Sequence, residues 1–342
     1  MNGRQRVKNA LDFKKVDKVP LEYYYTPVGY YEHGEKLNDL FASLPGDFQA
    51  FERKPIPIIT KEQTDKDGNY HEFKQDPWQT VWEYRIYGIA GIPKKYPLED
   101  LSQVYNYKAP DIPLIGTADF FETKKAFDKH KENYYLTKSA GSLLERMIAL
   151  SPDENIYCEL IEGSKEINVL ADLITENISK RVEYLLALDV DGISFGDDYG
   201  SESTLLLSPE LWRSFFKPRW KYLFDPILKA GKYIHFHSCG YVLPILEDLR
   251  ELGISSIWPQ LPAYNMEAFA KYCKSIGLAV VIHTDRANTM TFGSPQDVKD
   301  LVKREYEVFD MHQGGSWFYV EADNGFPFEN LEALVEAISK YR

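Results

Sequence analysis

The stretch IHFHSCGYV, residues 234–242, carries two histidines and a cysteine at alternate positions of one short apolar run. Residues two apart in a β-strand point to the same face, so His235, His237 and Cys239 stand in one row. Imidazole and thiolate groups on one face can bind one metal ion at about 2.0–2.3 Å, and this mixed donor set favours zinc. The alternative is core packing, because cysteine is often buried. The spacing alone does not separate the two interpretations.

A catalytic zinc ion needs about three protein ligands, and this strand supplies two of them. Glu321 closes the apolar run SWFYVE, residues 316–321, and offers a carboxylate; Asp323 is the second candidate. For either residue the alternative is a solvated or ion-paired loop carboxylate.

Other ionisable residues follow expected strands. Asp197 and Asp198 in SFGDDYGSE offer a general base, a substrate anchor or an orienting partner for metal ligands. Adjacent strand residues point in opposite directions, so we expect one of the two to face the site and the other to cap a helix or turn. His283 and Asp285 share a face and can form an oriented imidazole–carboxylate pair, with an interior packed histidine as the alternative.

Aromatic residues point to a pocket for an apolar substrate. The run VPLEYYY, residues 19–25, holds three successive tyrosines, most of which we expect in the core. One or two at the mouth of a cavity would suit a flat apolar or aromatic substrate with a polar handle. We expect Tyr24, Trp258 and Asp197 to contact substrate, and Asp198 and His283 to take part in catalysis.

The elements that position these residues alternate along the chain. Strand patterns lie at residues 190–198, 232–240, 254–260, 278–285 and 316–321, and helical patterns at 208–231, 242–253, 266–277 and 294–309. Repeated strand, helix, strand predicts a parallel sheet. Three strands of the first half, at 19–25, 46–51 and 134–140, bring the count to about eight, which predicts an α/β fold of the closed (β/α)₈ TIM-barrel type.

Catalytic sites of such barrels lie at the C-terminal ends of the strands, which is where the ionisable residues gather in this sequence. The segment 61–91 breaks the alternation with a DG turn between polar and aromatic runs, which predicts a β-hairpin insertion that forms a lid or a dimer contact. No repeat or linker divides the chain, so we expect one domain, residues 1–342, with a homodimer as a possible assembly.

Composition excludes several partners. Forty Lys and Arg against 52 Asp and Glu give a net charge of −12, which would repel nucleic acid. The N-terminal residues contain no apolar segment of signal-peptide length, and no run of about 18 apolar residues follows, so we expect a cytoplasmic protein without membrane contact. Three cysteines are too few for a disulfide framework, which leaves Cys239 as a free thiol.

Several stretches together resemble the uroporphyrinogen decarboxylase superfamily: RVKNALDFKKVDKVP, GDDYGSESTLLLSPELWRSFFKPRW, HFHSCGYV, FGSPQDVKDLV and GFPFENLEALVEAI. The resemblance implies a (β/α)₈ barrel. In HxCG the chain is similar to the corrinoid-dependent methyltransferases of that superfamily, whose zinc histidine and cysteine fall on His237 and Cys239. Those enzymes place a further cysteine before the Pro-x-x-Asn of the last helix. This chain has VEADNGF before PFEN, so the resemblance carries the third-ligand role to Glu321.

The decarboxylase itself holds a polycarboxylated tetrapyrrole with arginines after its first strand, and this chain has no arginine between Arg6 and Arg53. We therefore expect a zinc-dependent methyltransferase that works with a corrinoid on a partner protein. A methyl ether, such as a methoxylated aromatic, is the expected substrate. The alternatives are methyl transfer to a thiol or tetrahydrofolate, a metal-free decarboxylase-like enzyme with Asp198 as the charge-stabilising group, and a non-catalytic corrinoid- or partner-binding barrel.

Overall fold

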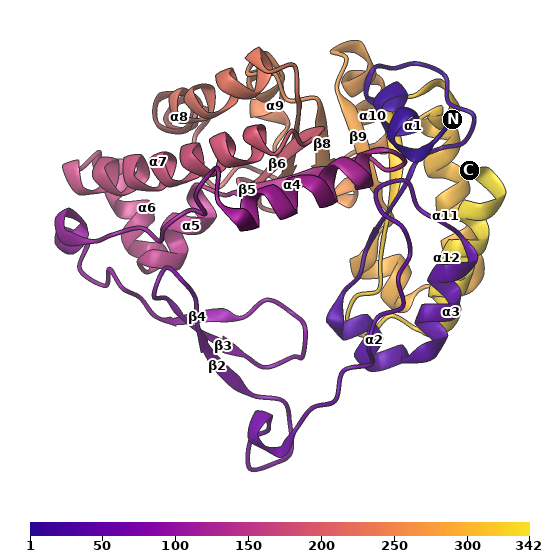
Figure 1. Cartoon of the computed structure of the whole chain (residues 1–342), viewed down its shortest axis with the longest axis horizontal. Coiled ribbons are helices and arrows are strands. Elements are labelled where there is room, and N and C mark those ends of the chain that lie inside the picture. Colours follow the sequence, from indigo (N-terminus) through magenta and orange to yellow (C-terminus); the bar gives the residue numbers. More distant parts are fainter.

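The computed structural model describes residues 1–342, and its central feature is one curled sheet of seven parallel strands (Figure 1). Their order in the sheet is β1-β10-β9-β8-β7-β6-β5. The strands are β1 Leu21–Tyr24, β5 Thr137–Gly141, β6 Gly192–Gly196, β7 Tyr233–Ser238, β8 Ser256–Pro259, β9 Ala279–His283 and β10 Ser316–Glu321. From β5 to β10, strands that follow one another in the chain are neighbours in the sheet, and β1 pairs with β10, as in a TIM barrel. The predicted α/β fold is confirmed.

The eighth position of the barrel is filled by an irregular segment. Asp47 donates its backbone N–H to the carbonyl of Leu21 at 2.8 Å and accepts from the N–H of Tyr135 at 3.1 Å. Its carboxylate also accepts from the N–H of Leu21 at 2.9 Å and pairs with Arg342 at 2.6 Å. One residue thus joins the two edges of the sheet. The prediction of a regular strand at 46–51 is wrong, because these bonds tie down one residue only.

Helices follow the strands and cover the outside of the sheet (Figure 1). They are α1 Gly3–Leu11, α2 Pro27–His33, α3 Glu35–Ser43, α4 Ala118–Lys131, α5 Leu144–Leu150, α6 Asp153–Glu162, α7 Lys165–Ala187, α8 Pro209–Lys229, α9 Leu243–Glu251, α10 Met266–Ser275, α11 Pro295–Val308 and α12 Phe328–Tyr341. Side chains of Ser208, Asn265 and Ser294 accept hydrogen bonds from the first turns of α8, α10 and α11, which fixes where these helices begin. None of the helices combines the length and the apolar character needed to cross a bilayer.

Side chains along each strand point alternately outward, to the hydrophobic core beneath the helices, and inward, to the interior of the barrel. On β7, Ile234 and Phe236 face outward and are fully buried beneath the helices, where the ring of Phe236 lies 5.3 Å from that of Trp220 on α8. His235 and His237 face inward, as the two-residue period predicts. The outward row therefore supplies the hydrophobic core, and the inward row supplies the wall of a cavity.

The insertion is an antiparallel sheet of three strands, β2 Glu72–Gln75, β3 Val81–Tyr84 and β4 Ile92–Lys95. We call residues 61–95 the arch. A hairpin is therefore present as predicted, but its turn lies at residues 76–80. The predicted DG turn at Asp67 and Gly68 closes only a single bridge between Thr64 and Tyr70.

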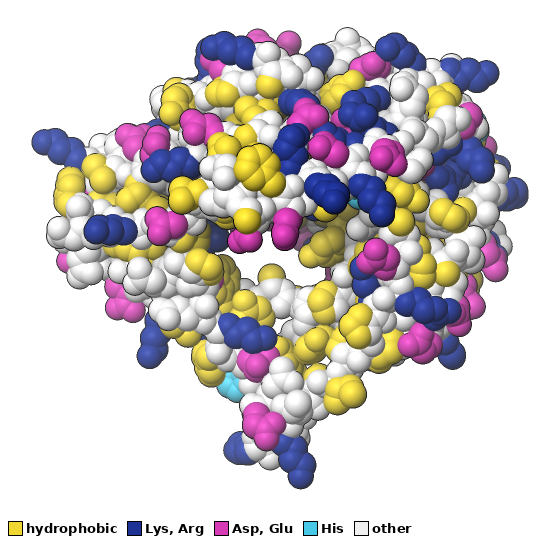
Figure 2. Space-filling model, viewed as in Figure 1, with side chains coloured by type: hydrophobic (Ala, Val, Ile, Leu, Met, Phe, Trp, Pro, Cys, Tyr) yellow, Lys and Arg dark blue, Asp and Glu magenta, His cyan; other side chains and the backbone are white.

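The arch contacts the barrel at two places, and each contact is with a helix that follows a strand of the barrel. At one end, Thr80 donates its hydroxyl to the carbonyl of Ala149 on α5 at 2.7 Å. At the other end, Gly88 packs against the backbone of Val28 on α2. Because α5 follows β5 and α2 follows β1, the arch spans the C-terminal rim between the two edges of the sheet. A space-filling view shows an opening between the arch and the barrel (Figure 2).

Candidate metal centre and substrate cavity

Three potential metal ligands meet at the C-terminal rim of the barrel. The Sγ atom of Cys239 lies 3.3 Å from Nε2 of His237, and Oδ1 of Asp198 lies 3.5 Å from the same nitrogen. Ligand atoms of the three residues all lie within 4.8 Å of one another, and each side chain is partly exposed. One nitrogen, one sulfur and one oxygen donor with an accessible side form the kind of set that holds a catalytic zinc ion.

The tautomer of His237 is set by a backbone hydrogen bond. Its Nδ1 lies 2.9 Å from the carbonyl oxygen of Trp258, an acceptor only, so Nδ1 carries the proton. The lone pair of Nε2 therefore faces Cys239 and Asp198. Burial lowers the pKa of this imidazole, which keeps it neutral and able to bind a metal.

Two glycines hold the ligand loops together. Gly240 has φ +71°, and a Cβ there would lie 2.3 Å from the carbonyl of Gly200, so a side chain fits neither the conformation nor the space. Across this contact the N–H of Tyr241 donates to the carbonyl of Ser201 at 2.7 Å. The carboxylate of Asp198 accepts from the N–H of Cys239 at 2.8 Å. The loop after β6 is thereby fixed against the loop after β7.

Without a metal the thiol of Cys239 is protonated. Burial, and then the charge of Asp198, raise its pKa to about 12. A thiol in this state is a poor nucleophile at neutral pH. Metal binding deprotonates such thiols, so the environment of Cys239 suits a ligand better than a free nucleophile.

Glu321 lies outside this group of three and makes other contacts. Its Oε1 is 3.4 Å from Nε2 of His283 and 3.4 Å from the guanidinium of Arg286, which also lies 3.3 Å from Asp323. Burial, and then Asp323, raise the pKa of Glu321. The structure thus places Asp198, which the sequence suggested for catalysis, where Glu321 was expected.

Asp197 does not reach the cavity, contrary to its expected role in binding substrate. The side chain is 0% exposed, and its carboxylate accepts hydrogen bonds from the backbone N–H groups of Leu143, Leu144 and Glu145 and from the hydroxyl of Tyr199. It therefore caps the start of α5, and Asp198 is the member of the pair that faces the site.

Asp285 is not the partner of His283. Its carboxylate accepts from the backbone N–H groups of Ala287 and Asn288 and so caps the π-helical turn Arg286–Met290. His283 faces Glu321 instead, and burial lowers its pKa to about 3, so its imidazole is neutral.

A cavity of about 490 Å³ extends into the barrel from His237, one of the three potential ligands. Trp258 and Tyr24, the two aromatic residues expected to contact substrate, both line it. The ring of Trp258 lies 4.3 Å from that of His237 and 4.4 Å from that of Tyr319, whereas Tyr24 stands at the mouth and is 56% exposed. Aromatic rings therefore surround the space next to the ligands.

Three residues of the site escaped the sequence analysis: Glu22, Arg286 and Tyr319. Gln260, which ends the strand pattern predicted at 254–260, also belongs to the site. Gln260 accepts from the N–H of Gly240 at 3.0 Å and braces the ligand loop. Glu22 and Tyr319 line the cavity two residues before Tyr24 and Glu321 on their strands, so the two-residue period would have found them. Arg286 follows a strand by three residues, and no local pattern indicates its direction.

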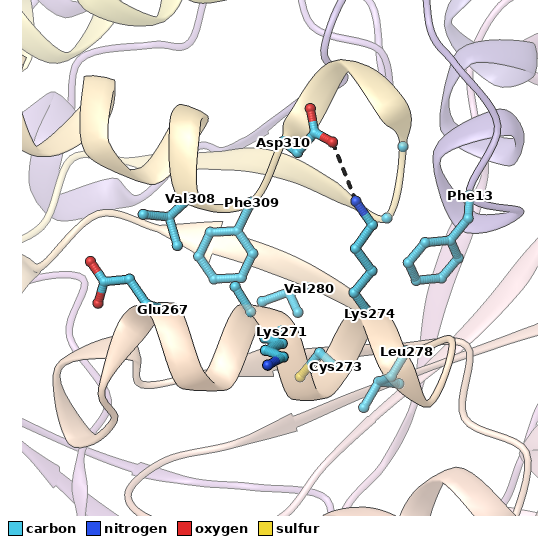
Figure 3. Close-up of a pocket in the computed structure, with 13 residues that line it drawn as sticks. Phe13, Glu267, Lys271, Cys273, Lys274, Leu278, Val280, Val308, Phe309 and Asp310 are labelled. Carbon is cyan, nitrogen blue, oxygen red and sulfur yellow. Dashed lines mark hydrogen bonds and ion pairs between the residues drawn. The ribbon is translucent and has the colours of Figure 1, made fainter.

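A second cavity, of about 300 Å³, lies between α10 and the segment before β10 (Figure 3). It opens at the N-terminal ends of β9 and β10, the end of a barrel that serves stability and not catalysis. Lys274 points toward Asp310 and pairs with it at 3.2 Å (Figure 3). Burial raises the pKa of the Cys273 thiol to about 12, so this group is not reactive. We find no catalytic set in this cavity.

The sequence of the barrel identifies its family. Residues 142–341, more than half of the chain, match the model of the uroporphyrinogen decarboxylase (URO-D) family. The chain belongs to this family. The matched residues include β6 and β7, and therefore all three potential ligands. Among curated proteins, no relative matches this URO-D family member by sequence.

One solved structure confirms the fold. A methyltransferase from Methanosarcina mazei is 16% identical, with a TM-score of 0.67 over 100% of this chain and 99% of its own. A 3-keto-D-glucoside 4-epimerase from E. coli is 12% identical, with a TM-score of 0.35 over 60% and 99% of the two chains. A dihydropteroate synthase from Xanthomonas albilineans is 12% identical, with a TM-score of 0.33 over 46% and 57%. The first likeness shows a shared fold, and the other two are too distant to support an argument.

Proposed function

We propose that this URO-D family member is a zinc-dependent methyltransferase that moves a methyl group between a small substrate and a corrinoid carried by a partner protein. The observation that carries the proposal is the group of three donors, His237, Cys239 and Asp198, at the rim of the barrel. The HxCG motif supports it further, because it resembles that of the corrinoid-dependent methyltransferases. In this proposal Asp198 takes the third-ligand role, and Glu321 remains on the cavity wall.

The chain's own residues would prepare the site as follows. His237 presents the lone pair of Nε2, and Cys239 binds as a thiolate after it loses its proton. Zinc, when bound, supplies a Lewis acid for the heteroatom that carries the methyl group. Trp258 and Tyr319 exclude water from one side of that atom and hold an apolar substrate body. A methyl ether, such as a methoxylated aromatic, suits these walls.

The departing oxygen of a methyl ether needs a proton after the carbon–oxygen bond breaks. Glu321, whose pKa is raised, lies beside the neutral imidazole of His283 on the cavity wall. We assign this pair the role of holding that proton, since a carboxyl group with a raised pKa can act as an acid near neutral pH.

Two other activities compete with this proposal. Methyl transfer to a thiol or to tetrahydrofolate would use the same ligands in the acceptor direction. A metal-free decarboxylase-like enzyme would use Asp198 to stabilise charge and would need no metal. Metal content separates the decarboxylase-like enzyme from both kinds of methyltransferase. The choice of substrate separates the two directions of methyl transfer.

The test is metal analysis by plasma emission on anaerobically purified protein. We expect about one zinc per chain, lost in His237→Ala, Cys239→Ser and Asp198→Asn and kept in Glu321→Gln. With zinc present, the conversion of cobalt(I) to methyl-cobalt(III) corrinoid, followed by absorbance, tests methoxylated aromatics as donors. Native protein that takes up no zinc, even when zinc is added back, contradicts the proposal and favours the decarboxylase-like activity.

A further inference from the structure

Beneath the rim, the cavity continues to a second, deeper ring of side chains that the proposed function leaves unused. Glu22 precedes Tyr24 by two residues on β1, and His235 precedes His237 by two on β7; all four line the same cavity. Two residues of a strand span about 6.6 Å. The cavity therefore runs about one interior layer down from the metal ligands, and Glu22 lies at its deeper level.

Glu22 has no cationic partner in the protein. Its Oε2 accepts a hydrogen bond from Nε1 of Trp317 at 3.0 Å, and it forms no ion pair. The imidazole of His235, which lines the same cavity, is not free to pair with it, since its two nitrogens contact the hydroxyls of Ser256 at 2.7 Å and Tyr135 at 2.8 Å. Burial raises the pKa of Glu22 to about 7. A carboxyl group in such surroundings is costly unless something pairs with it.

The walls at this level add acceptors and aromatic rings. Thr137, Ser139 and Ser194 line the cavity, and the Oγ1 atom of Thr137 is buried without a hydrogen-bond partner. The rings of Trp317 and Tyr319 line it as well. No lysine or arginine contributes to the lining. An anionic group would find no counter-charge here, whereas a donor group would find several acceptors.

We infer that Glu22 is a substrate-recognition residue and that the buried end of the substrate donates a hydrogen bond to it from a hydroxyl or an ammonium group. The inference rests on the proposed function, which places the reacting methyl group at the rim and so leaves the rest of the molecule to fill the cavity below. Compounds whose buried end is a carboxylate are rejected by like charge. Aromatic walls accept both a flat phenol and an ammonium group, so the shared chemistry is donation to Glu22.

Four compounds of similar shape separate these possibilities: 4-methoxyphenol, 4-methoxybenzylamine, 4-methylanisole and 4-methoxybenzoate. Their binding to the zinc-loaded protein is measured by calorimetry in the absence of corrinoid. We expect at least one of the two donor compounds to bind tenfold or more tightly than 4-methylanisole, and 4-methoxybenzoate to bind more weakly than either. Loss of this preference in Glu22→Leu supports the inference.

Glu22→Gln identifies the donor, because the amide still accepts from a hydroxyl but no longer offers a negative charge to an ammonium group. A phenol then loses a few-fold in affinity, and the amine loses at least tenfold. The control is Glu305→Gln, which replaces a buried carboxylate outside the cavity and leaves the order of affinities unchanged. Circular dichroism and zinc content show that each variant is folded.

The outcomes distinguish the two proposals. If zinc binds and methyl transfer occurs, but Glu22→Leu leaves the order of affinities unchanged, the inference fails and the proposed function stands. If the donor preference depends on Glu22 but no methyl transfer is found, the proposed function fails and the recognition site remains. Failure of both donor compounds to bind at millimolar concentration overturns the inference.

Discussion

The sulfur of Cys239 lies 3.3 Å from Nε2 of His237, and the opposite nitrogen of that ring is held 2.9 Å from the carbonyl of Trp258. The backbone of β8 therefore orients the imidazole of His237 on β7. Because the orienting group belongs to the main chain, side-chain substitutions at Trp258 leave the tautomer unchanged. The orientation of this potential ligand is thus set by the sheet itself.

Asp197 and Asp198 are neighbours, but Asp197 caps a helix and Asp198 faces the candidate metal site. We therefore expect substitution of Asp197 to lower stability and substitution of Asp198 to lower zinc content. Asp197→Asn weakens the cap on α5, because an amide group replaces one of the two carboxylate oxygens that accept several buried hydrogen bonds. We expect urea denaturation to show a loss of about 2–4 kcal/mol in the free energy of unfolding, with zinc content retained. Asp198→Asn should lose zinc. In the metal-free protein this variant should lower the free energy of unfolding by less than about 1 kcal/mol. Equal losses of stability would contradict this division.

The three thiols should differ in reactivity. Cys158 is exposed on α6, Cys273 lies on the buried face of α10, and the raised pKa of Cys239 leaves little thiolate at neutral pH. We expect a coloured disulfide reagent to modify about one thiol per chain quickly in the native metal-free protein at pH 7.5. Cys158→Ser should remove that fast phase. A fast phase that persists in Cys158→Ser would show that Cys239 is a reactive thiolate.

Local periodicity was sufficient to predict that two of the potential ligands lie together. The two-residue period placed His237 and Cys239 on one face, and it depends on nothing outside the strand. The choice of third ligand depends on strand order instead. β6 is adjacent to β7, whereas β10 is three strands away, or about 14 Å at the usual spacing. Asp198 on the loop after β6 can therefore reach the pair more readily than Glu321 can.

Other features depend on contacts that no local pattern encodes. Asp197 was expected at the site because it ends a strand, but the first turn of α5 provides three N–H donors for its carboxylate. The irregular closure at Asp47 depends on Arg342, which is far away in the sequence. The arch was predicted as an insertion, but its attachment to α2 and α5 is a tertiary contact.

The contact between Gly88 and α2 predicts how the arch is fastened. Gly88 has φ +75°, and a Cβ there would lie 2.5 Å from the backbone nitrogen of Val28. Gly68 has a similar φ of +84° with open space around it, so Gly68→Ala is a matched control for backbone strain. We expect Gly88→Ala to increase the rate of limited proteolysis within residues 61–95 several-fold over Gly68→Ala. Equal rates in the two variants would show that the contact does not hold the arch.

Glu305 predicts a loss of stability at alkaline pH. Its side chain is 1% exposed and accepts from the hydroxyl of Thr284 at 2.8 Å, and burial raises its pKa from 4.5 to about 8. Between these values the folded state binds more protons than the unfolded state, so the free energy of unfolding falls as pH rises from 4.5 to 8. Glu305→Gln should unfold like the native protein near pH 4 and exceed it by about 2–4 kcal/mol at pH 9, as measured by urea denaturation. The exposed variant Glu329→Gln should show no such difference. A constant offset between Glu305→Gln and native protein at both pH values would show that Glu305 does not titrate in this range.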